Sequence, residues 1–258
     1  MKLATFSIIT VTYNAAQYIE RTLQSVASQT CKDFEYIIVD GASNDGTLEI
    51  IANYELRITN FGCKFLVISE KDQGLYDAMN KGLRLATGDY VWFLNAGDTF
   101  YNENTLQALN TQHLTLNTQY SVLYGETEVV NSSGNSLGMR RLRAPKQLDW
   151  KSFRMGMTVC HQSFVVKRAI APEFDLQYRY ASDIDWCINC MKKTDSIHNT
   201  HLILSRFLEA GLSAQKRKEA LKERYRIMCR NYGVIPTIIR HLWFALRFYT
   251  AKLLKKTI

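Results

Sequence analysis

The sequence of 258 residues lacks the features that define several large classes of protein. Its six cysteines are scattered, which argues against a disulfide-stapled scaffold. No basic leader with an apolar segment and cleavage site precedes the first strand-like run, so we expect a cytosolic, reducing compartment. No uncharged apolar run approaches the ~20 residues needed to span a bilayer. The first strand-like run is not followed by GxGxxG, the pattern expected there in a dinucleotide oxidoreductase.

The cysteines give equally little evidence of a metal centre. Cys187 and Cys190 form a single CxxC with no second pair. Such residues are more often small buried hydrophobes than a zinc or redox site, so we expect a structural role. With 47% hydrophobic and 22% charged residues, the composition is that of an ordinary globule: one large domain, or one domain with an appendage.

The positive charge is concentrated at the C-terminal end of the chain. The formal net charge is +8, yet residues 1–210 hold 20 Lys and Arg against 22 Asp and Glu. Residues 211–258 hold 12 basic residues against two acidic ones. Because the composition changes near Gly211 to Ala214, we expect a separate basic tail from there onward.

Two periodicities alternate over the first hundred residues. The apolar runs FSIITV, FEYIIVD, KFLVISE and DYVWFL predict four strands. Segments with helical spacing of apolar residues separate these runs, and Gly88 stands where the third helix should have its C-cap. A β-α-β-α-β-α-β order is typical of an α/β protein with a mainly parallel sheet and helices on both faces.

The pattern loosens after residue 101. SVLYGETEVV and SFVVK predict short strands in a mixed or antiparallel arrangement, with a turn in NSSGNS. SDIDWCINCMKK predicts a helix, and HLILSRFLE a further strand.

Two aspartates stand where strands of the predicted sheet end. Ligands of such sheets bind outside the carboxyl ends of the strands, where Asp40 and Asp98 follow the second and fourth runs. Asp40 could accept hydrogen bonds from a base or ribose, or simply open a turn. Asp98 suits Mg²⁺ or Mn²⁺, which takes few protein carboxylates and fills its other positions with phosphate oxygens and water. Alternatively, it caps the helix predicted in TFYNENTLQALN.

A second acidic pair opens the helix predicted in SDIDWCINCMKK. Ser182 and Asp185 fit the capping pattern [ST]-x-x-[DE], so Asp183 and Asp185 could simply stabilise the start of the helix. A carboxylate facing the strand ends is also what a reaction needs to deprotonate a hydroxyl nucleophile. The sequence leaves both interpretations open.

Together these stretches resemble family 2 glycosyltransferases, the inverting nucleotide-sugar enzymes of the GT-A fold. SIITVTYNAAQYIERTLQSVASQT is similar to the opening strand and helix of that family, and IIVDGASNDGT to its donor-binding strand end. DAMNKGLRLATGDYVWFLNAGD is similar to its helix leading into the metal motif, and ASDIDW to its acceptor-side acidic motif. The likeness covers roughly residues 4 to 190. More narrowly, DQGLYDAMNKG, FLNAGD and CHQSFVVKR resemble the bacterial exopolysaccharide branch that includes colanic acid transferases.

The resemblance implies a fold and a set of site residues. The fold is a Rossmann-like GT-A sheet, with residues 1–100 as the nucleotide-sugar-binding half, 101–210 as the acceptor-binding half and 211–258 as basic amphipathic helices. Asp98 would hold Mn²⁺ or Mg²⁺, and Asp183 would be the general base of a direct, inverting displacement. The implied donor-binding residues are Thr12, Tyr13, Asp40, Asp72, Asn80, Lys81 and Asn95. His161 and Gln162 would lie near the reacting groups, although a His entering a strand is as often structural.

The chain departs from the family pattern at its acidic motifs. The family commonly has two Asp residues before Gly-Ser at the first site, and here Asp40 stands alone before Gly41. Met79 stands where an arginine is frequent, and Lys81 could substitute for it. Asn95 and Gly97 occupy places where acids are common, which should weaken metal binding. Ser182 likewise replaces an acid before the predicted base.

The tail predicts two helices separated by Gly233 and Pro236. The second carries Trp243 and further aromatic residues among Arg and Lys, the composition of a helix that lies in an anionic membrane surface. This agrees with an acceptor on a polyprenyl diphosphate and a place at the inner face of the cell membrane. A basic helix packed on the catalytic domain is the alternative. No recognised nucleic-acid module accompanies the charge.

Two other functions compete with sugar transfer. A nucleotidyltransferase shares the sheet, the nucleotide and the metal, but it should show a Gly-rich loop with Arg or Lys near the first strand, which TVTYNAAQYIE lacks. An inactive sugar-nucleotide-binding scaffold protein, anchored by its tail, agrees with the reduced metal motif.

Overall fold

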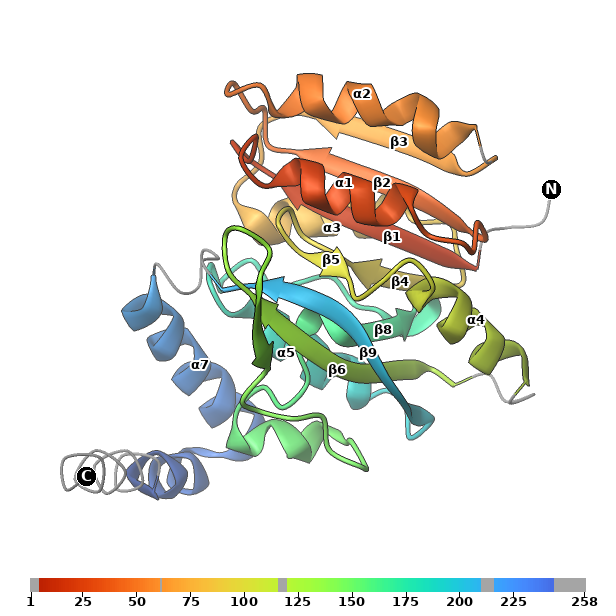
Figure 1. The fold of residues 1–258 in the computed structure, drawn as a ribbon. Helices are drawn as coiled ribbons and strands as arrows, with labels where there is room; N and C mark the ends of the chain where they lie inside the picture. Colours follow the sequence, from red (N-terminus) through yellow and green to blue (C-terminus); the bar gives the residue numbers. More distant parts are fainter. Residues whose placement is uncertain (1–4, 61, 116–119, 210–215, 244–258) are drawn as a thin grey trace, which may run out of the picture.

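A computed structural model describes residues 5–60, 62–115, 120–209 and 216–243, which form a twisted mixed sheet between layers of helices (Figure 1). The strands are β1 (Phe6–Thr12), β2 (Phe34–Asp40), β3 (Lys64–Ser69), β4 (Tyr90–Phe93), β5 (Thr99–Phe100), β6 (Val122–Val130), β7 (Ser136–Met139), β8 (Phe164–Lys167) and β9 (Ile197–Leu208). The α-helices are α1 (Ile19–Ala27), α2 (Thr47–Thr59), α3 (Leu75–Leu85), α4 (Thr105–Thr115), α5 (Ser182–Met191) and α7 (Arg217–Tyr232).

The first half of the sheet is parallel, as predicted. Its strands lie in the order β3-β2-β1-β4, and every neighbouring pair is parallel. The register places Thr12 beside Asp40 and Asp40 beside Ser69. Three polar side chains therefore end three adjacent strands in one row at the carboxyl edge.

The second half of the sheet is mixed, which also agrees with the sequence. β8 pairs antiparallel with both β4 and β6, while β6 runs parallel to β9. β9 begins at Ile197, four residues before the run HLILSRFLE that predicted it. Because β4 pairs directly with β8, the sheet continues without a break from one half to the other.

The two faces of the sheet bury different residues because side chains alternate along a strand. Ile8 and Tyr36 belong to the hydrophobic cluster that lies under α1, α2 and α4. Ile9 and Ile37 belong to the cluster on the opposite face, which contains residues of α3 and α5. Both faces being covered explains why the strand runs are almost entirely apolar.

Gly88 does not end a helix, so the predicted C-cap is wrong. α3 ends at Leu85 with Ala86 as its C-cap. The Gly88 N–H donates instead to Ser7 Oγ at 2.9 Å. A Cβ at position 88 would lie 2.9 Å from the Ser7 backbone nitrogen, so the glycine allows this close approach to β1.

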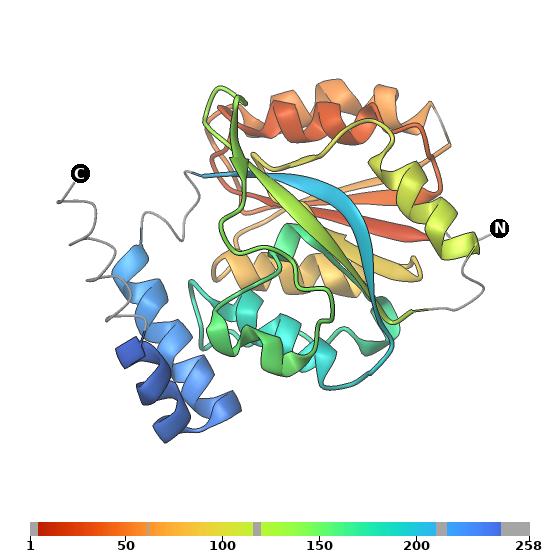
Figure 2. The same ribbon diagram turned by 60° about the horizontal axis from the view of Figure 1, so that its bottom comes forward.

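The tail continues as helices that lie beside α5 on one side of the body (Figure 1 and Figure 2). α7 buries Ile227 and Met228, and Ile227 belongs to the same hydrophobic cluster as Trp186 of α5. After Gly233 a second helix runs from residue 234 to 243, where the described part ends. The boundary predicted near Gly211 and the basic and aromatic residues beyond 243 lie outside the described residues. Among the helices that are described, none is both long and apolar enough to cross a bilayer.

Candidate active site

Asp40 organises the loop that leaves the second strand. Its side chain is fully buried and accepts hydrogen bonds from the Ser43 N–H at 2.9 Å, the Ser43 hydroxyl and the Ser69 hydroxyl at 2.7 Å. The turn-opening interpretation of Asp40 is thus confirmed. A carboxylate has about four acceptor positions, so one remains beside those three bonds.

Tyr13, Gly41 and Asp72 meet at the same edge. A Cβ on Gly41 would lie 2.7 Å from Asp72 Oδ2 and 3.2 Å from Tyr13 Cδ2, so both side chains touch the glycine backbone. The Tyr13 ring is 66% exposed. An open aromatic face beside a carboxylate is suited to stacking on a base and accepting a hydrogen bond from a sugar hydroxyl.

Asn80 and Lys81 lie on α3 with their polar atoms engaged. The Asn80 amide donates to the Phe174 carbonyl at 3.0 Å and accepts from the Phe174 N–H at 2.7 Å. Lys81 Nζ forms an ion pair with Glu70 at 2.9 Å and donates to the Lys71 carbonyl. Asn80 therefore ties α3 to the segment before α5, a connection that sequence reasoning did not predict.

Asp98 points into the protein. Its Oδ1 accepts from the Leu208 N–H at 2.9 Å, and its Oδ2 from the Gln162 amide at 2.8 Å. The residue is 4% exposed, and burial raises the pKa of its carboxyl to about 7, although the two hydrogen bonds and the nearby Arg21 act in the opposite direction. The alternative that Asp98 caps a helix is wrong, because α4 begins only at Thr105.

The backbone conformation and surroundings of Gly97 explain why this position, directly before Asp98, does not carry an acid. Gly97 has a φ of +97°, a left-handed conformation that favours glycine. A Cβ there would lie 2.7 Å from Leu208 Cδ2. The end of β9 thus fills the space that an acidic side chain at position 97 would need.

The residues at the strand ends partly fit a divalent cation. Asn95 Oδ1 is buried without a hydrogen-bond partner, as is Thr12 Oγ1. Each Asp98 oxygen keeps a second lone pair beside its N–H contact. One amide oxygen and one carboxylate are suitable ligands for an ion whose other positions are filled by a diphosphate and water. The described residues contain no group of three or more His, Cys, Asp or Glu able to hold a metal without such help.

Asp183 lies in the first turn of α5, but the capping interpretation of its neighbours is wrong. The N-cap is Ala181, and the helix has no side-chain cap of its own. The Ser182 hydroxyl donates to the Asp175 carbonyl, and Asp185 accepts from Asn189 at 2.8 Å. Asp183, which is only partly buried, accepts from the Tyr76 hydroxyl of α3 at 3.2 Å.

His161 and Gln162 bridge the regions of the two aspartates. Gln162 bonds Asp98 and accepts from the Cys160 thiol at 3.0 Å. Burial lowers the pKa of His161 to about 4, although the charge of Asp183 acts to raise it. The imidazole is therefore neutral near pH 7, and its Nε2 is buried without a hydrogen-bond partner.

An aromatic layer supports this part of the site. Phe174 stacks on Trp186 with ring centroids 4.9 Å apart, and Tyr76 stacks on Phe174 at 5.5 Å. Phe93 stacks on His161 at 5.2 Å. Packed rings have few alternative positions, so they hold the Tyr76 hydroxyl and the imidazole in place.

The single CxxC contributes nothing to the site. Cys187 and Cys190 are fully buried thiols, and burial raises the pKa of both well above its usual value. A protonated, buried thiol is a small hydrophobic residue, as predicted.

Sequence reasoning missed the partner of Asp183. Tyr76 lies within the quoted motif DQGLYDAMNKG, but an aromatic residue on a helix is ordinarily a core residue, and no spacing rule connects it with position 183. It is 4% exposed, so most of its ring does belong to the core.

The comparisons with known proteins agree with one another. The family model described as "Glycosyl transferase family 2" matches residues 7–171. A PGL/p-HBAD biosynthesis glycosyltransferase of Mycobacterium bovis is 35% identical over 211 residues, which cover 80% of this chain and 77% of the relative. An Escherichia coli protein described as UDP-Glc:alpha-D-GlcNAc-diphosphoundecaprenol beta-1,3-glucosyltransferase WfaP is 26% identical over 91% of this chain and 94% of its own.

Solved structures share the fold. S. aureus TarS 1-349 in complex with UDP-GlcNAc has a TM-score of 0.66 and 18% identity, over 93% of this chain and 73% of its own. The mannosyltransferase PcManGT of Pyrobaculum calidifontis, in complex with GDP-Man and Mn²⁺, has a TM-score of 0.63 and 16% identity, over 98% and 79%.

Proposed function

The chain belongs to glycosyl transferase family 2 and has the GT-A fold, and from this we propose that it moves a sugar from a nucleoside diphosphate to an acceptor hydroxyl with inversion. Family membership by itself identifies the chain as a glycosyltransferase. The direction of attack, the base and the acceptor are the proposal.

The observation that carries the proposal is the position of Asp183. This carboxylate has no capping duty, it is partly exposed, and Tyr76 of α3 donates a hydrogen bond to one of its oxygens. The other oxygen is available to take the proton from an acceptor hydroxyl as that hydroxyl attacks the anomeric carbon. Tyr76 fixes the orientation of the carboxylate, and the neutral His161 beside it offers a hydrogen bond without adding positive charge.

The donor would bind along the carboxyl ends of β1 to β4. The exposed Tyr13 ring would stack on the base, with Asp40 and Asp72 accepting hydrogen bonds from the base or ribose. Thr12 has a buried hydroxyl that no protein group bonds, and a donor oxygen or hydroxyl would satisfy it. Asn80 and Lys81 would shape this part of the site through their contacts with neighbouring backbone.

The diphosphate would lie beside the loop Asn95 to Asp98. A divalent cation bound with it would be held by Asp98 and the Asn95 amide oxygen, and would neutralise charge on the departing nucleoside diphosphate. Gln162 donates a hydrogen bond to the Asp98 carboxylate and so restricts its orientation.

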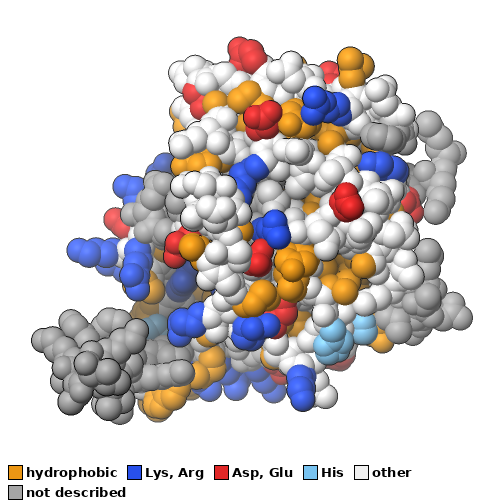
Figure 3. Space-filling model, in the orientation of Figure 1, with side chains coloured by type: hydrophobic (Ala, Val, Ile, Leu, Met, Phe, Trp, Pro, Cys, Tyr) orange, Lys and Arg blue, Asp and Glu red, His pale blue; other side chains and the backbone are white. Residues whose placement is uncertain are grey.

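The tail and one relative support a proposal for the acceptor and the location. WfaP is named for a diphosphoundecaprenol acceptor, and we propose a lipid-linked acceptor of the same kind, in synthesis of a bacterial surface polysaccharide at the inner face of the membrane. The helix from residue 234 to 243 exposes an apolar face, in which Ile235 is 73% and Ile239 61% exposed. Figure 3 shows hydrophobic side chains at the lower left beside the grey residues, with Lys and Arg side chains above them. A helix of this kind would insert its apolar face into an anionic bilayer surface.

Asp183→Asn tests the proposed chemistry. The amide cannot accept the acceptor proton, so we expect kcat to fall by about 10² to 10⁴-fold while binding of the nucleotide sugar, measured by calorimetry, stays unchanged. Near-normal kcat in this variant would remove Asp183 from the role of base. Donor binding without transfer or hydrolysis in the wild type would instead favour the scaffold protein.

The membrane part has a separate test. Replacing Ile235 and Ile239 by Glu should abolish sedimentation with phosphatidylglycerol vesicles, because the charges oppose insertion of the apolar face. The matched control is Leu56→Glu, at an exposed leucine of α2 remote from the tail. Equal sedimentation of both variants would contradict membrane docking through this helix.

A further inference from the structure

The basic helix α7 contributes one carboxylate to the body of the protein. Glu223 accepts hydrogen bonds from three consecutive backbone N–H groups, those of Arg179 at 2.9 Å, Tyr180 at 2.7 Å and Ala181 at 3.0 Å. Ala181 is the N-cap of α5, and Asp183 follows two residues later. The tail therefore holds the segment that leads directly into the turn carrying the proposed base.

This contact lies directly before the start of α5, a helix with no side-chain cap of its own, and it bonds the N–H groups of residues 179–181 rather than those of the first helical turn. The first N–H groups of a helix have no partners within the helix, and a side-chain oxygen at the N-cap usually satisfies one of them. An alanine cannot do so. A carboxylate at this end is doubly favourable, since its bonds to N–H groups are charge-assisted and the helix dipole attracts negative charge there.

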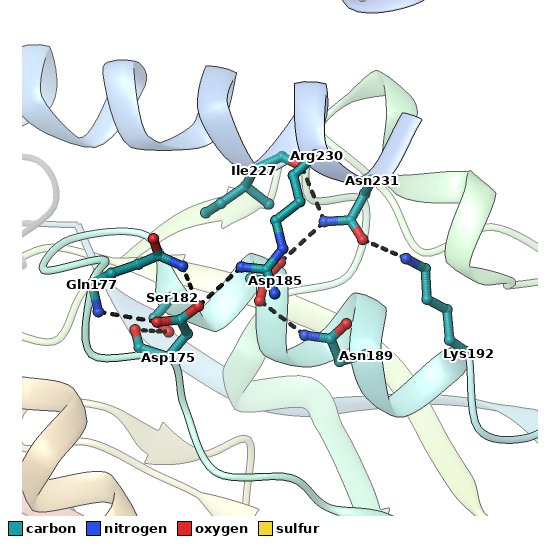
Figure 4. A network of polar contacts seen from close by, with 9 residues as sticks. All are labelled: Asp175, Gln177, Ser182, Asp185, Asn189, Lys192, Ile227, Arg230 and Asn231. Atoms are coloured by element: carbon teal, nitrogen blue, oxygen red, sulfur yellow. Dashed lines mark hydrogen bonds and ion pairs between the residues drawn. The ribbon is translucent and has the colours of Figure 1, made fainter. Parts of the chain in front are cut away.

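Further contacts hold α7 along the side of α5 (Figure 4). Asn231 donates to Asp185 Oδ1 at 3.0 Å, while Asn189 of α5 occupies Oδ2. Arg230 forms an ion pair with Asp175 at 2.9 Å, just before α5 begins. Ser182 in turn donates to the Asp175 carbonyl. The contacts of Glu223, Arg230 and Asn231 thus converge on the first turn of α5 and the segment that leads into it.

The sequence of the tail makes this acid unusual. Residues 211–258 contain only two acidic residues, Glu219 and Glu223, against 12 basic ones. A helix whose sole task was to lie on an anionic surface would gain nothing from either acid. Glu219 is exposed, whereas Glu223 is partly buried against the turn before α5.

We propose that Glu223 is a positioning residue for catalysis, which sets the orientation of Asp183 through the backbone of residues 179–181. This inference depends on the proposed role of Asp183 as general base. On this account the tail is part of the active-site structure as well as a membrane anchor. Displacing the turn would move the Asp183 carboxylate relative to Tyr76 and the acceptor, and a misplacement of about 1 Å can cost 10²-fold in rate.

The test compares Glu223→Gln and Glu223→Ala with the matched control Glu219→Gln in the full chain. We expect kcat to fall about 10-fold to 100-fold in both Glu223 variants, while the donor KM and the thermal shift caused by nucleoside diphosphate stay at wild-type values. The control should match the wild type. Hydrogen exchange of the amides of residues 179–185 should become faster in the Glu223 variants only.

Two results would overturn the inference. The first is a kcat within twofold of wild type in the folded Glu223→Gln and Glu223→Ala proteins. The second is a joint loss of kcat, donor affinity and nucleotide-induced thermal shift, which would mean general damage to the fold. Failure of the proposed function gives a different pattern: hydrogen exchange would still respond to Glu223, but the wild type would transfer no sugar.

Discussion

The buried carboxyl of Asp98 makes a prediction about stability that can be worked out from its surroundings. Its pKa is raised from 3.8 to about 7 in the folded protein, so the folded state holds this proton to a higher pH than the unfolded state does. The associated stability is fully present below pH 3.8 and is lost as the pH rises through 7. The difference of about three between the folded and the unfolded pKa of Asp98 corresponds to about 4 kcal/mol of unfolding free energy.

Asp98→Asn removes the titration and keeps the size of the side chain. The asparagine has only one acceptor oxygen, so it cannot accept from both Leu208 and Gln162, which costs about 1 to 3 kcal/mol at every pH. In addition to this pH-independent cost, the difference in unfolding free energy between wild type and variant should depend on pH. From pH 4 to pH 8 it should shift by about 4 kcal/mol in favour of the variant.

Urea denaturation in EDTA, followed by fluorescence at several pH values, measures that difference. Taking the difference between the two unfolding free energies removes the contribution of every other titrating group whose pKa the substitution does not change. A difference that stays constant across this range would refute the account of Asp98 as a buried carboxyl held without a cation. Adding Mn²⁺ and a nucleoside diphosphate at pH 8 should stabilise the wild type but not the variant, because a cation favours the ionised carboxylate.

Two other substitutions have predictable effects on stability. Hydrogen bonds from Ser7, Thr87 and Lys64 outweigh burial and lower the pKa of Glu35 from 4.5 to about 2. The cost of Glu35→Gln in urea denaturation should therefore be about 3 kcal/mol larger at pH 6 than at pH 2, and an equal cost at both would contradict this. Gly97→Ala should lower the unfolding free energy by about 1 to 3 kcal/mol in the same assay, because residue 97 has a φ of +97° and the new Cβ would collide with Leu208. An unchanged unfolding free energy would show that β9 can move to make room.

The local patterns of the sequence were sufficient for the elements and for the edge where ligands bind. Apolar β-branched runs and helical spacing predicted the parallel strands, since those signals depend only on neighbouring residues. The same order of elements predicted that Asp40 and Asp98 would stand at the carboxyl ends of strands, because parallel strands share one carboxyl edge, and Asp40 does end β2 there. Gly88 was misassigned because its reason is a close approach to Ser7, which is 81 residues away in the chain.

What the carboxylates do was decided only by tertiary structure. The capping pattern at Ser182 and Asp185 is a property of four neighbouring residues, yet both side chains bond groups outside it. Burial raises the pKa of Asp98, and the hydrogen bonds from Gln162 and Leu208 that act in the opposite direction come from distant parts of the chain.

The sequence by itself therefore determined the family, the order of strands and helices, and which acids stand at the strand ends, because these follow from local periodicity and motif order. Only the folded structure decided that Tyr76 holds Asp183, that Leu208 excludes an acid from position 97, and that Glu223 of the tail binds the backbone just before α5. Each of these is a contact between residues far apart in the chain, and the energy of such a contact depends on distances that no local pattern specifies.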